Sequence, residues 1–239
     1  MKKQYKVILI SVGFIVSLYI IGRITGIFQF YKTPAGSMEP TLMKDSRFII
    51  SNLKKPKRND IISFKRVITE KDGFAEPGKK LTFLYRLIAF GGETIQIKNG
   101  LAYVNGKLVD DSTNLKFNYI TTAENFKQLA PVFNSELNIP GKFSLNDVDG
   151  FAVMSLSYDE YLRVKGTMAV TKDTMDKDIH NDLYTNNENK KWTPNNFGPI
   201  KIPEKYYFVL GDNRNFSADS RYFGPIPEKD FVGTFITTY

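Results

Sequence analysis

An uninterrupted apolar run dominates the start of the chain. Residues 7–22 carry no charged side chain, and the apolar character continues to Phe30 with Arg23 as its one charge. A helix rises about 1.5 Å per residue, so a helix over 7–30 would cross the ~30 Å hydrocarbon core of a bilayer, with Arg23 reaching its polar interface. The pattern therefore predicts a transmembrane helix over residues 7–30.

The charges before this run predict its orientation. Lys2, Lys3 and Lys6 precede it, and basic residues favour the cytoplasmic side of a membrane. We therefore expect residues 1–6 in the cytoplasm and residues 31–239 on the other side. A cleavable signal peptide begins in a similar way, but the length of the run and the lack of a small-residue cleavage pattern favour an uncleaved anchor.

Beyond the run, short strand-like segments replace the helical pattern. They are rich in β-branched and aromatic residues and are separated by Asn, Asp, Pro and Gly, as strands bounded by turns are. These segments cover residues 47–52, 61–65, 81–89, 206–210 and 231–238. They predict a set of strands after the anchor.

The strongest turn signals fall in residues 93–109. Ile95 and Ile97 alternate with polar residues, and Asn-Gly pairs follow at 99–100 and 105–106. Asn-Gly between alternating segments is typical of two-residue hairpin turns, so two linked hairpins are expected. The predicted fold class is mainly β: an antiparallel β domain preceded by one N-terminal transmembrane helix.

Residues 107–200 form a less regular and more polar stretch. Residues 123–129 and 173–182 are candidates for short helices, although neither has a clear apolar stripe. We interpret the stretch as an inserted subdomain or as elaborated loops of the β domain.

The composition excludes several chemistries. The 239 residues contain no cysteine and one histidine, His180, which excludes a disulfide framework, a thiolate nucleophile and a cysteine-ligated zinc. A Ser-His-Asp triad would depend on His180, whose polar neighbours predict a solvated loop. No metal and no cofactor are expected. The net charge of +8 comes from scattered basic residues, which favours membrane lipid as the anionic partner rather than nucleic acid.

Two segments carry the groups that a reaction would need. In residues 34–42 (PAGSMEPTL), Ser37 lies between Gly36 and Pro40, which would hold its hydroxyl and amide in a fixed loop. In residues 211–221 (GDNRNFSADSR), two acids, two arginines and two serines directly follow an apolar strand. So many hydrogen-bonding groups at a strand end predict a satisfied polar network.

Together with the anchor, these segments resemble the bacterial type I signal peptidases, membrane-anchored serine endopeptidases that remove signal peptides from exported proteins. The resemblance rests on a serine box at 37–41 (SMEPT), a second box at 59–64 (NDIISF) and a last box at 211–224. It implies a location in the bacterial inner membrane, with the catalytic domain outside the cytoplasm. It also implies signal peptides as substrates, with small residues at positions −1 and −3 before the cut.

The resemblance further implies roles for single residues. Ser37 would be the nucleophile, its amide would stabilise the oxyanion, and a lysine would be the general base. Ser217 would orient that base, and Asp219 with Arg221 would brace the site. Two positions before the nucleophile, where members of the family can carry a hydroxyl, this chain has Ala35, which leaves backbone donors on that side.

The sequence departs from the family at the general base. The family has Lys-Arg at the start of the box that carries the base, whereas this chain has Tyr85 followed by Arg86. Burial lowers the pKa of a lysine from about 10.4 and yields a neutral amine, but it raises the pKa of a tyrosine above about 10. The same pocket therefore makes lysine a better base and tyrosine a worse one.

Three alternatives remain open at this point. The chain could use another lysine, with Lys65 on the neighbouring predicted strand as first candidate and Lys79 or Lys80 as others. It could use a serine assisted by Tyr85, which as a base would need a nearby cation such as Arg86. Finally, it could be a catalytically silent relative that acts as an envelope binding or scaffold protein.

Overall fold

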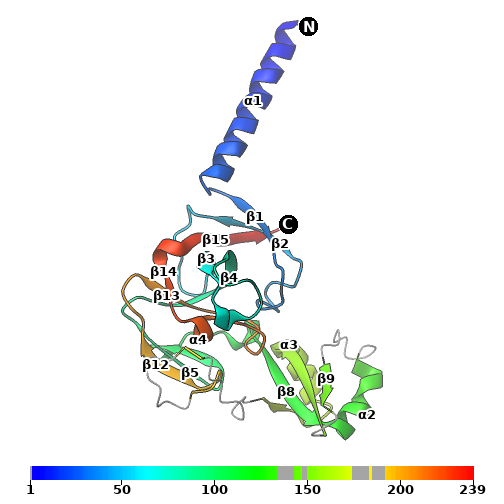
Figure 1. Cartoon of the computed structure of the whole chain (residues 1–239). Helices are drawn as coiled ribbons and strands as arrows, with labels where there is room; N and C mark the ends of the chain where they lie inside the picture. The colour runs from blue at the N-terminus through cyan, green and yellow to red at the C-terminus, as the bar shows by residue number, and fades with distance from the viewer. Residues whose placement is uncertain (1, 134–142, 147–149, 174–182, 185–191) are drawn as a thin grey trace.

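One long helix projects from a β-rich body (Figure 1). The computed structural model describes residues 2–133, 143–146, 150–173, 183–184 and 192–239. Within these residues, every pair of neighbouring named strands runs antiparallel. The predicted fold class, mainly antiparallel β behind an N-terminal helix, is therefore confirmed.

The helix α1 (Lys2–Ile24) begins earlier and ends earlier than the predicted span. Thr25 still bonds to Ile21 O through its amide and hydroxyl, and Gly26 follows with a φ of 76°, the left-handed conformation in which many helices end. The helix prediction is therefore wrong at its C-terminal end, because Phe30 belongs to a strand. Its apolar part, Gln4–Ile24, has a mean hydropathy of 2.3 and is long and apolar enough to cross a membrane.

The main sheet has seven strands in the order β1-β2-β15-β3-β4-β13-β14. They are β1 (Gln29–Lys32), β2 (Arg47–Ser51), β3 (Ile61–Val67), β4 (Lys80–Phe90), β13 (Tyr206–Leu210), β14 (Ile226–Pro227) and β15 (Phe231–Thr238). All five segments predicted as strands lie in this sheet. Phe64, Leu87 and Val209 are among its fully buried side chains. The long pair of β3 and β4 forms the floor on which the candidate site lies.

A second sheet contains the two predicted hairpins. Its four strands have the order β12-β5-β6-β7. They are β5 (Thr94–Lys98), β6 (Leu101–Val104), β7 (Lys107–Leu108) and β12 (Phe197–Lys201). Asn99, Gly100, Asn105 and Gly106 all have positive φ, as two-residue hairpin turns require. The prediction of two linked hairpins is confirmed.

A third sheet, with the strand order β11-β8-β10-β9, builds a separate lobe. Its elements are β8 (Lys116–Thr122), α2 (Ala123–Phe133), β9 (Phe143–Asn146), β10 (Phe151–Ser157), α3 (Tyr158–Lys165) and β11 (Thr171–Lys172). Phe117, Met154 and Val164 belong to its own buried core. We call residues 116–172 the inserted subdomain; in Figure 1 it lies on the side of the body away from α1.

The predicted bounds of the insertion, 107–200, were too wide, because β7 and β12 pair within the hairpin sheet. The helix predicted at 123–129 is the first part of α2. The helix predicted at 173–182 lies outside the described residues beyond Asp173, and so does His180. The remaining short helices are η1 (Glu70–Asp72), η2 (Ser112–Asn114), α4 (Ser220–Phe223) and η3 (Glu228–Asp230).

Candidate active site

Ser37 lies in the loop between β1 and β2, where this loop meets residues 211–221. The backbone N–H of Asn213 donates to Ser37 O at 3.0 Å, and the side-chain amide of Asn213 donates to Gly36 O at 3.1 Å. A Cβ on Gly211 would lie 2.7 Å from Ser37 O, so this close approach requires glycine. The two segments that the sequence singled out are thus joined by main-chain contacts around a half-buried Ser37.

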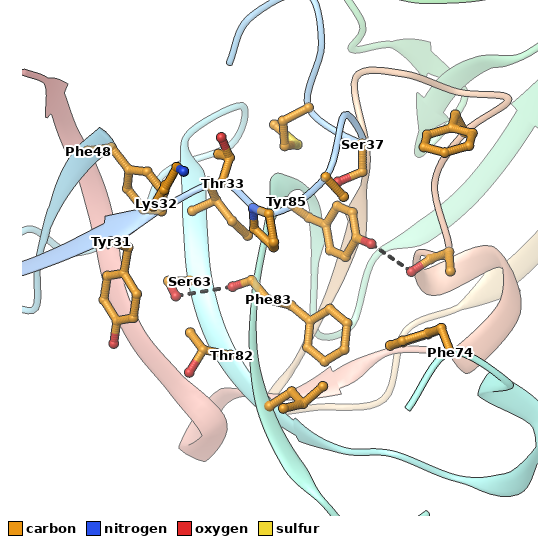
Figure 2. Close-up of a pocket in the computed structure, with 17 residues that line it drawn as sticks. Tyr31, Lys32, Thr33, Ser37, Phe48, Ser63, Phe74, Thr82, Phe83 and Tyr85 are labelled. Atoms are coloured by element: carbon orange, nitrogen blue, oxygen red, sulfur yellow. Dashed lines mark hydrogen bonds between the residues drawn. The ribbon is translucent and has the colours of Figure 1, made fainter. Parts of the chain in front are cut away.

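Ser37 lines a pocket of about 630 Å³ on the β3–β4 floor (Figure 2). Tyr85 and Ala218 also line this pocket, and the rest of its wall is largely apolar. The aromatic members of this wall are Tyr31, Phe48, Phe74, Phe83 and Phe216. A mostly apolar concave wall with a few polar groups is typical of a ligand-binding site.

Tyr85 is buried in β4, and its hydroxyl donates to Ala218 O at 2.9 Å. Burial raises the pKa of this phenol well above its ordinary value of 10, and the negative charge of Asp219 raises it further. The hydroxyls of Ser217 and Ser37 and the charge of Arg221 act in the opposite direction and are outweighed. Tyr85 is therefore a neutral phenol at any physiological pH.

Behind Tyr85, a buried acid holds the last box together. Asp219 accepts hydrogen bonds from the Ser217 hydroxyl at 2.9 Å and from Gly211 N at 3.0 Å. Arg221 donates to both carboxylate oxygens of Asp219 at 2.8 Å, and neither Asp219 nor Arg221 is exposed to solvent. A two-point contact of this kind fixes the orientation of both groups. The polar network predicted from residues 211–221 is present, and Ser217, Asp219 and Arg221 meet in it.

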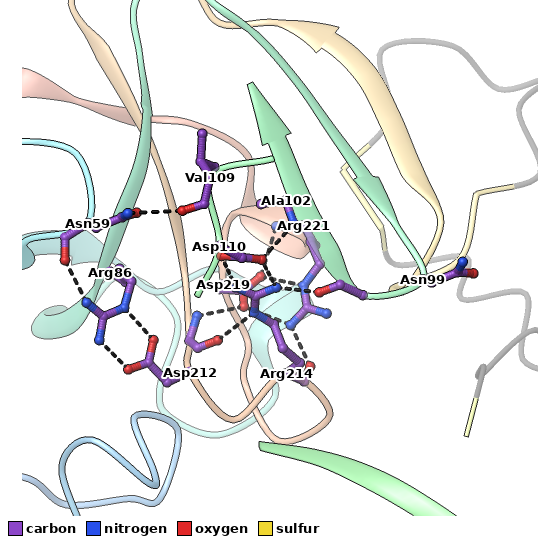
Figure 3. Close-up of polar contacts among 12 residues, drawn as sticks. Asn59, Arg86, Asn99, Ala102, Val109, Asp110, Asp212, Arg214, Asp219 and Arg221 are labelled. Carbon is purple, nitrogen blue, oxygen red and sulfur yellow. Dashed lines mark hydrogen bonds and ion pairs between the residues drawn. The ribbon is translucent and has the colours of Figure 1, made fainter. Parts of the chain in front are cut away.

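Arg86 has a different partner from the expected one. Its guanidinium donates to both oxygens of Asp212, at 2.7 and 2.6 Å, and to Asn59 O at 2.6 Å (Figure 3). Successive side chains of a strand point to opposite faces of the sheet, so Arg86 points away from Tyr85. The expectation that Arg86 would be the cation beside Tyr85 is therefore wrong. The cation whose charge acts on Tyr85 is Arg221.

The structure does not bring Lys65 to Ser37. Lys65 is exposed on β3 and pairs with Thr82, whereas Tyr85 pairs with Ile62. Directly opposed residues share a face and neighbouring positions alternate, so Lys65 and Tyr85 lie on opposite faces of the sheet. The idea that Lys65 fills the space of a lysine at position 85 is thus wrong.

The other lysine candidates are not among the residues that line the pocket of Ser37. Lys79 is exposed, and Lys80 pairs with Asp230 at 3.2 Å. Among the described residues that line the pocket, Lys32 is the one lysine, and it forms an exposed ion pair with Asp45 at 2.8 Å.

Three residues contribute to the site although the sequence analysis gives them no role. Asp212 accepts a hydrogen bond from the Thr41 hydroxyl at 2.5 Å as well as those from Arg86, and Asn213 clamps the serine loop. Both lie in the last box, which was the signal that could have found them. Lys116 reaches the serine box from the inserted subdomain, through a contact that no local pattern marks.

Comparison with known proteins decides the family. A family model described as "Signal peptidase, peptidase S26" matches residues 3–239. The chain belongs to this signal peptidase family. Among its relatives, Signal peptidase I V of Bacillus subtilis (strain 168) is 28% identical over 211 residues, which cover 87% of this chain and 83% of that protein. Signal peptidase I of Aquifex aeolicus (strain VF5) is 26% identical over 228 residues, covering 88% and 75%.

A crystal structure of a signal peptidase I from Enterococcus faecalis V583 matches with a TM-score of 0.32 and 23% sequence identity. The match covers 77% of this chain and 98% of that one.

Family membership itself supports a peptidase, a hydrolase that processes signal peptides. In this member of the family, Ser37 and the neutral phenol of Tyr85 line a largely apolar pocket, and the buried Asp219–Arg221 pair lies outside its lining.

Proposed function

We propose that this signal peptidase cleaves signal peptides from exported preproteins, with Ser37 as the nucleophile. The observation that carries the proposal is the position of Ser37. Ser37 lines a largely apolar pocket of about 630 Å³, and its carbonyl accepts a hydrogen bond from Asn213 N of the last box. A fixed nucleophile next to a concave binding wall is what acyl transfer to a serine requires.

The proton of Ser37 needs a path that does not require a phenolate. In the proposed reaction, Ser37 Oγ attacks the carbonyl carbon of the scissile bond, and the Ser37 amide stabilises the oxyanion. Because Tyr85 is neutral, it serves as a relay: it accepts the Ser37 proton while its own proton, which is donated to Ala218 O in the structure, passes to the leaving nitrogen. The C–N bond then breaks and the new amino terminus leaves, and water hydrolyses the acyl-enzyme, returning a proton to Ser37. No charge remains on Tyr85 at the end of this step, and the general-base lysine of the family is not needed. The rate is expected to be lower than with a true base, because a phenol is a weak proton acceptor.

The proposal also covers the membrane topology of the chain and the specificity of cleavage. We place α1 across the bacterial inner membrane with Lys2, Lys3 and Lys6 in the cytoplasm, so that the β domain faces the compartment into which preproteins emerge. The peptide binds as an extended strand with small residues at −1 and −3. A precursor with Phe at −1 is then cleaved far more slowly than one with Ala, because a bulky side chain clashes. Equal rates for the two precursors would contradict this specificity.

The deciding experiment uses the full chain in detergent micelles with a model precursor. Wild-type protein should release the signal peptide, and Ser37→Ala should not. A serine-directed acylating inhibitor should add its mass to the wild type and not to Ser37→Ala. If the wild type neither cleaves nor is acylated, the chain is a silent relative and the proposed function is wrong. If Ser37→Ala cleaves as fast as the wild type, another nucleophile is at work.

A further inference from the structure

We infer that Lys116, the first residue of β8, is a positioning residue that holds the Ser37 loop in place, so that the inserted subdomain is part of the active site. The effect on catalysis rests on the proposed function, but the effect on the loop does not. No motif marks Lys116. The inference comes from two sets of contacts, one made by its side chain and one by its backbone.

The side chain of Lys116 is buried against the serine box. Its ammonium donates to Glu39 Oε2 at 3.1 Å, and the two side chains are 7% and 1% exposed. The other carboxylate oxygen of Glu39 lies against the backbone of the residue before the nucleophile, since a Cβ on Gly36 would be 2.7 Å from Oε1. An ion pair that is shielded from water holds its groups more firmly than an exposed one. Glu39 thus transmits the position of Lys116 to the turn that carries Ser37.

The backbone of Lys116 holds the second segment that touches Ser37. Lys116 N donates to Asp212 O at 2.9 Å, and Arg214 N donates to Lys116 O at 3.0 Å. These two bonds lie on either side of Asn213, whose own N–H donates to Ser37 O. One residue of the inserted subdomain therefore contacts both segments that fix the nucleophile, through its ammonium on one side and its amide and carbonyl on the other.

Lys116 is not the missing general base. Its ammonium is directed at Glu39, and Lys116 is not among the residues that line the pocket. Its role is geometric. A displacement of about 1 Å in a reacting group can cost on the order of 10²-fold in rate, and a loop that loses a buried tether is free to move by that amount.

The first arm of the test is kinetic. Lys116→Met alone would remove the ammonium that faces the buried Glu39 carboxylate, and losing one member of a buried ion pair can unfold a protein. The main variant is therefore the pair Lys116→Met with Glu39→Gln, which removes both charges. We expect kcat to fall on the order of 10²-fold with KM unchanged. Lys116→Arg, made in the wild-type protein, keeps a cation opposite Glu39 and should retain most of the wild-type kcat. Arg58→Met is the matched control, since it removes a partly buried ion pair with Glu93 that does not touch the serine loop, and it should leave kcat unchanged.

The second arm needs no activity. Amide hydrogen exchange of residues 34–42 and of Asn213 reports whether the serine loop is still clamped. Exchange there should become on the order of tenfold faster in the double variant, as the loss of one tethering contact predicts, and should not change in Arg58→Met. A folded double variant with wild-type exchange at these amides overturns the inference. If the wild type proves inactive, the proposed function fails, and the exchange result still decides the role of Lys116.

Discussion

Replacing Tyr85 with phenylalanine removes a single oxygen atom from the pocket. The lost contact is the hydrogen bond from the Tyr85 hydroxyl to Ala218 O at 2.9 Å. A typical intramolecular hydrogen bond contributes about 1 kcal/mol to stability, and the ring remains packed among Phe64, Phe83 and Phe223. The Tyr85→Phe variant should therefore fold and keep its apolar pocket wall.

Its kinetics should change much more than its stability. If Tyr85 relays the Ser37 proton, its loss should lower kcat by about 10²- to 10⁴-fold, the usual cost of losing an acid–base group. KM should change little, because the apolar wall is intact. The wild-type rate should also show no rising limb between about pH 6 and 9, since burial keeps the phenol protonated throughout that range.

Tyr85→Lys provides the opposite perturbation at the same position. The burial that raises the pKa of the phenol lowers the pKa of an ammonium below about 10.4, so a fraction of the lysine is a neutral amine near neutral pH. Cleavage should become faster than in the wild type and should now increase with pH as the amine loses its proton. A change in the shape of the pH profile cannot come from altered packing alone.

The assay is cleavage of one model precursor by the four full-length proteins under identical conditions. Lys65→Ala is the control, because Lys65 is exposed on the opposite face of the sheet, and its rate should equal that of the wild type. If Tyr85→Phe cleaves the precursor at the wild-type rate, the relay is refuted. A large loss of cleavage rate in Lys65→Ala would show that Lys65 contributes to the reaction although the strand register places it on the face opposite Tyr85.

Three further predictions follow from the same contacts. Asp219→Asn leaves the buried Arg221 without its carboxylate partner and should cost about 3–5 kcal/mol in the free energy of unfolding, measured by urea denaturation; a cost below 1 kcal/mol would show that the pair is dispensable. Burial raises the pKa of Tyr119 to about 12, so the stability that its protonation provides is present below about pH 10 and is lost as the pH rises toward the folded-state value. The Tyr119→Phe variant should accordingly lose stability less steeply than the wild type across that window, and parallel curves would contradict the shift. An export-dependent reporter fused after Tyr239 should be active, whereas activity of a cytoplasmic reporter there would reverse the proposed topology.

Local patterns predicted most strands because their causes are local. The five predicted strands of the main sheet are runs of β-branched and aromatic residues between turn formers, and the hairpins depend on Asn99-Gly100 and Asn105-Gly106, which adopt positive φ at little cost. The end of α1 was placed too late for an equally physical reason. Phe28 and Phe30 are as apolar as a membrane span demands, but Phe30 packs its ring against Tyr239 at the C-terminus. Apolarity alone does not tell burial in lipid from burial in a sheet.

The motif residues of the site could be found from the sequence, but their partners could not. Ser37, Ser217, Asp219 and Arg221 come from segments dense in polar groups. In the structure Ser217, Asp219 and Arg221 share one buried network, and Ser37 contacts the same segment through Asn213; their catalytic roles stay predictions. The partner of Arg86 depends on which face of β4 the side chain occupies. Lys65 was a wrong candidate for the base because its register against Thr82 places it on the face opposite Tyr85. The contact of Lys116 with Glu39 spans 77 positions and has no local signature at all.

The electrostatics of the pocket act differently on a tyrosine and on a lysine at position 85. For a lysine at position 85, burial would favour the neutral amine while the negative charge of Asp219 would favour the ammonium, so the two effects oppose each other. For Tyr85, burial and Asp219 both favour the neutral phenol, and only the weaker effects of Ser217, Ser37 and Arg221 oppose them. No small adjustment of the same pocket yields a phenolate near neutral pH. In the proposed relay, the Ser37 proton therefore passes through a phenol that stays neutral, which is why the pH profile is the most direct evidence on that relay.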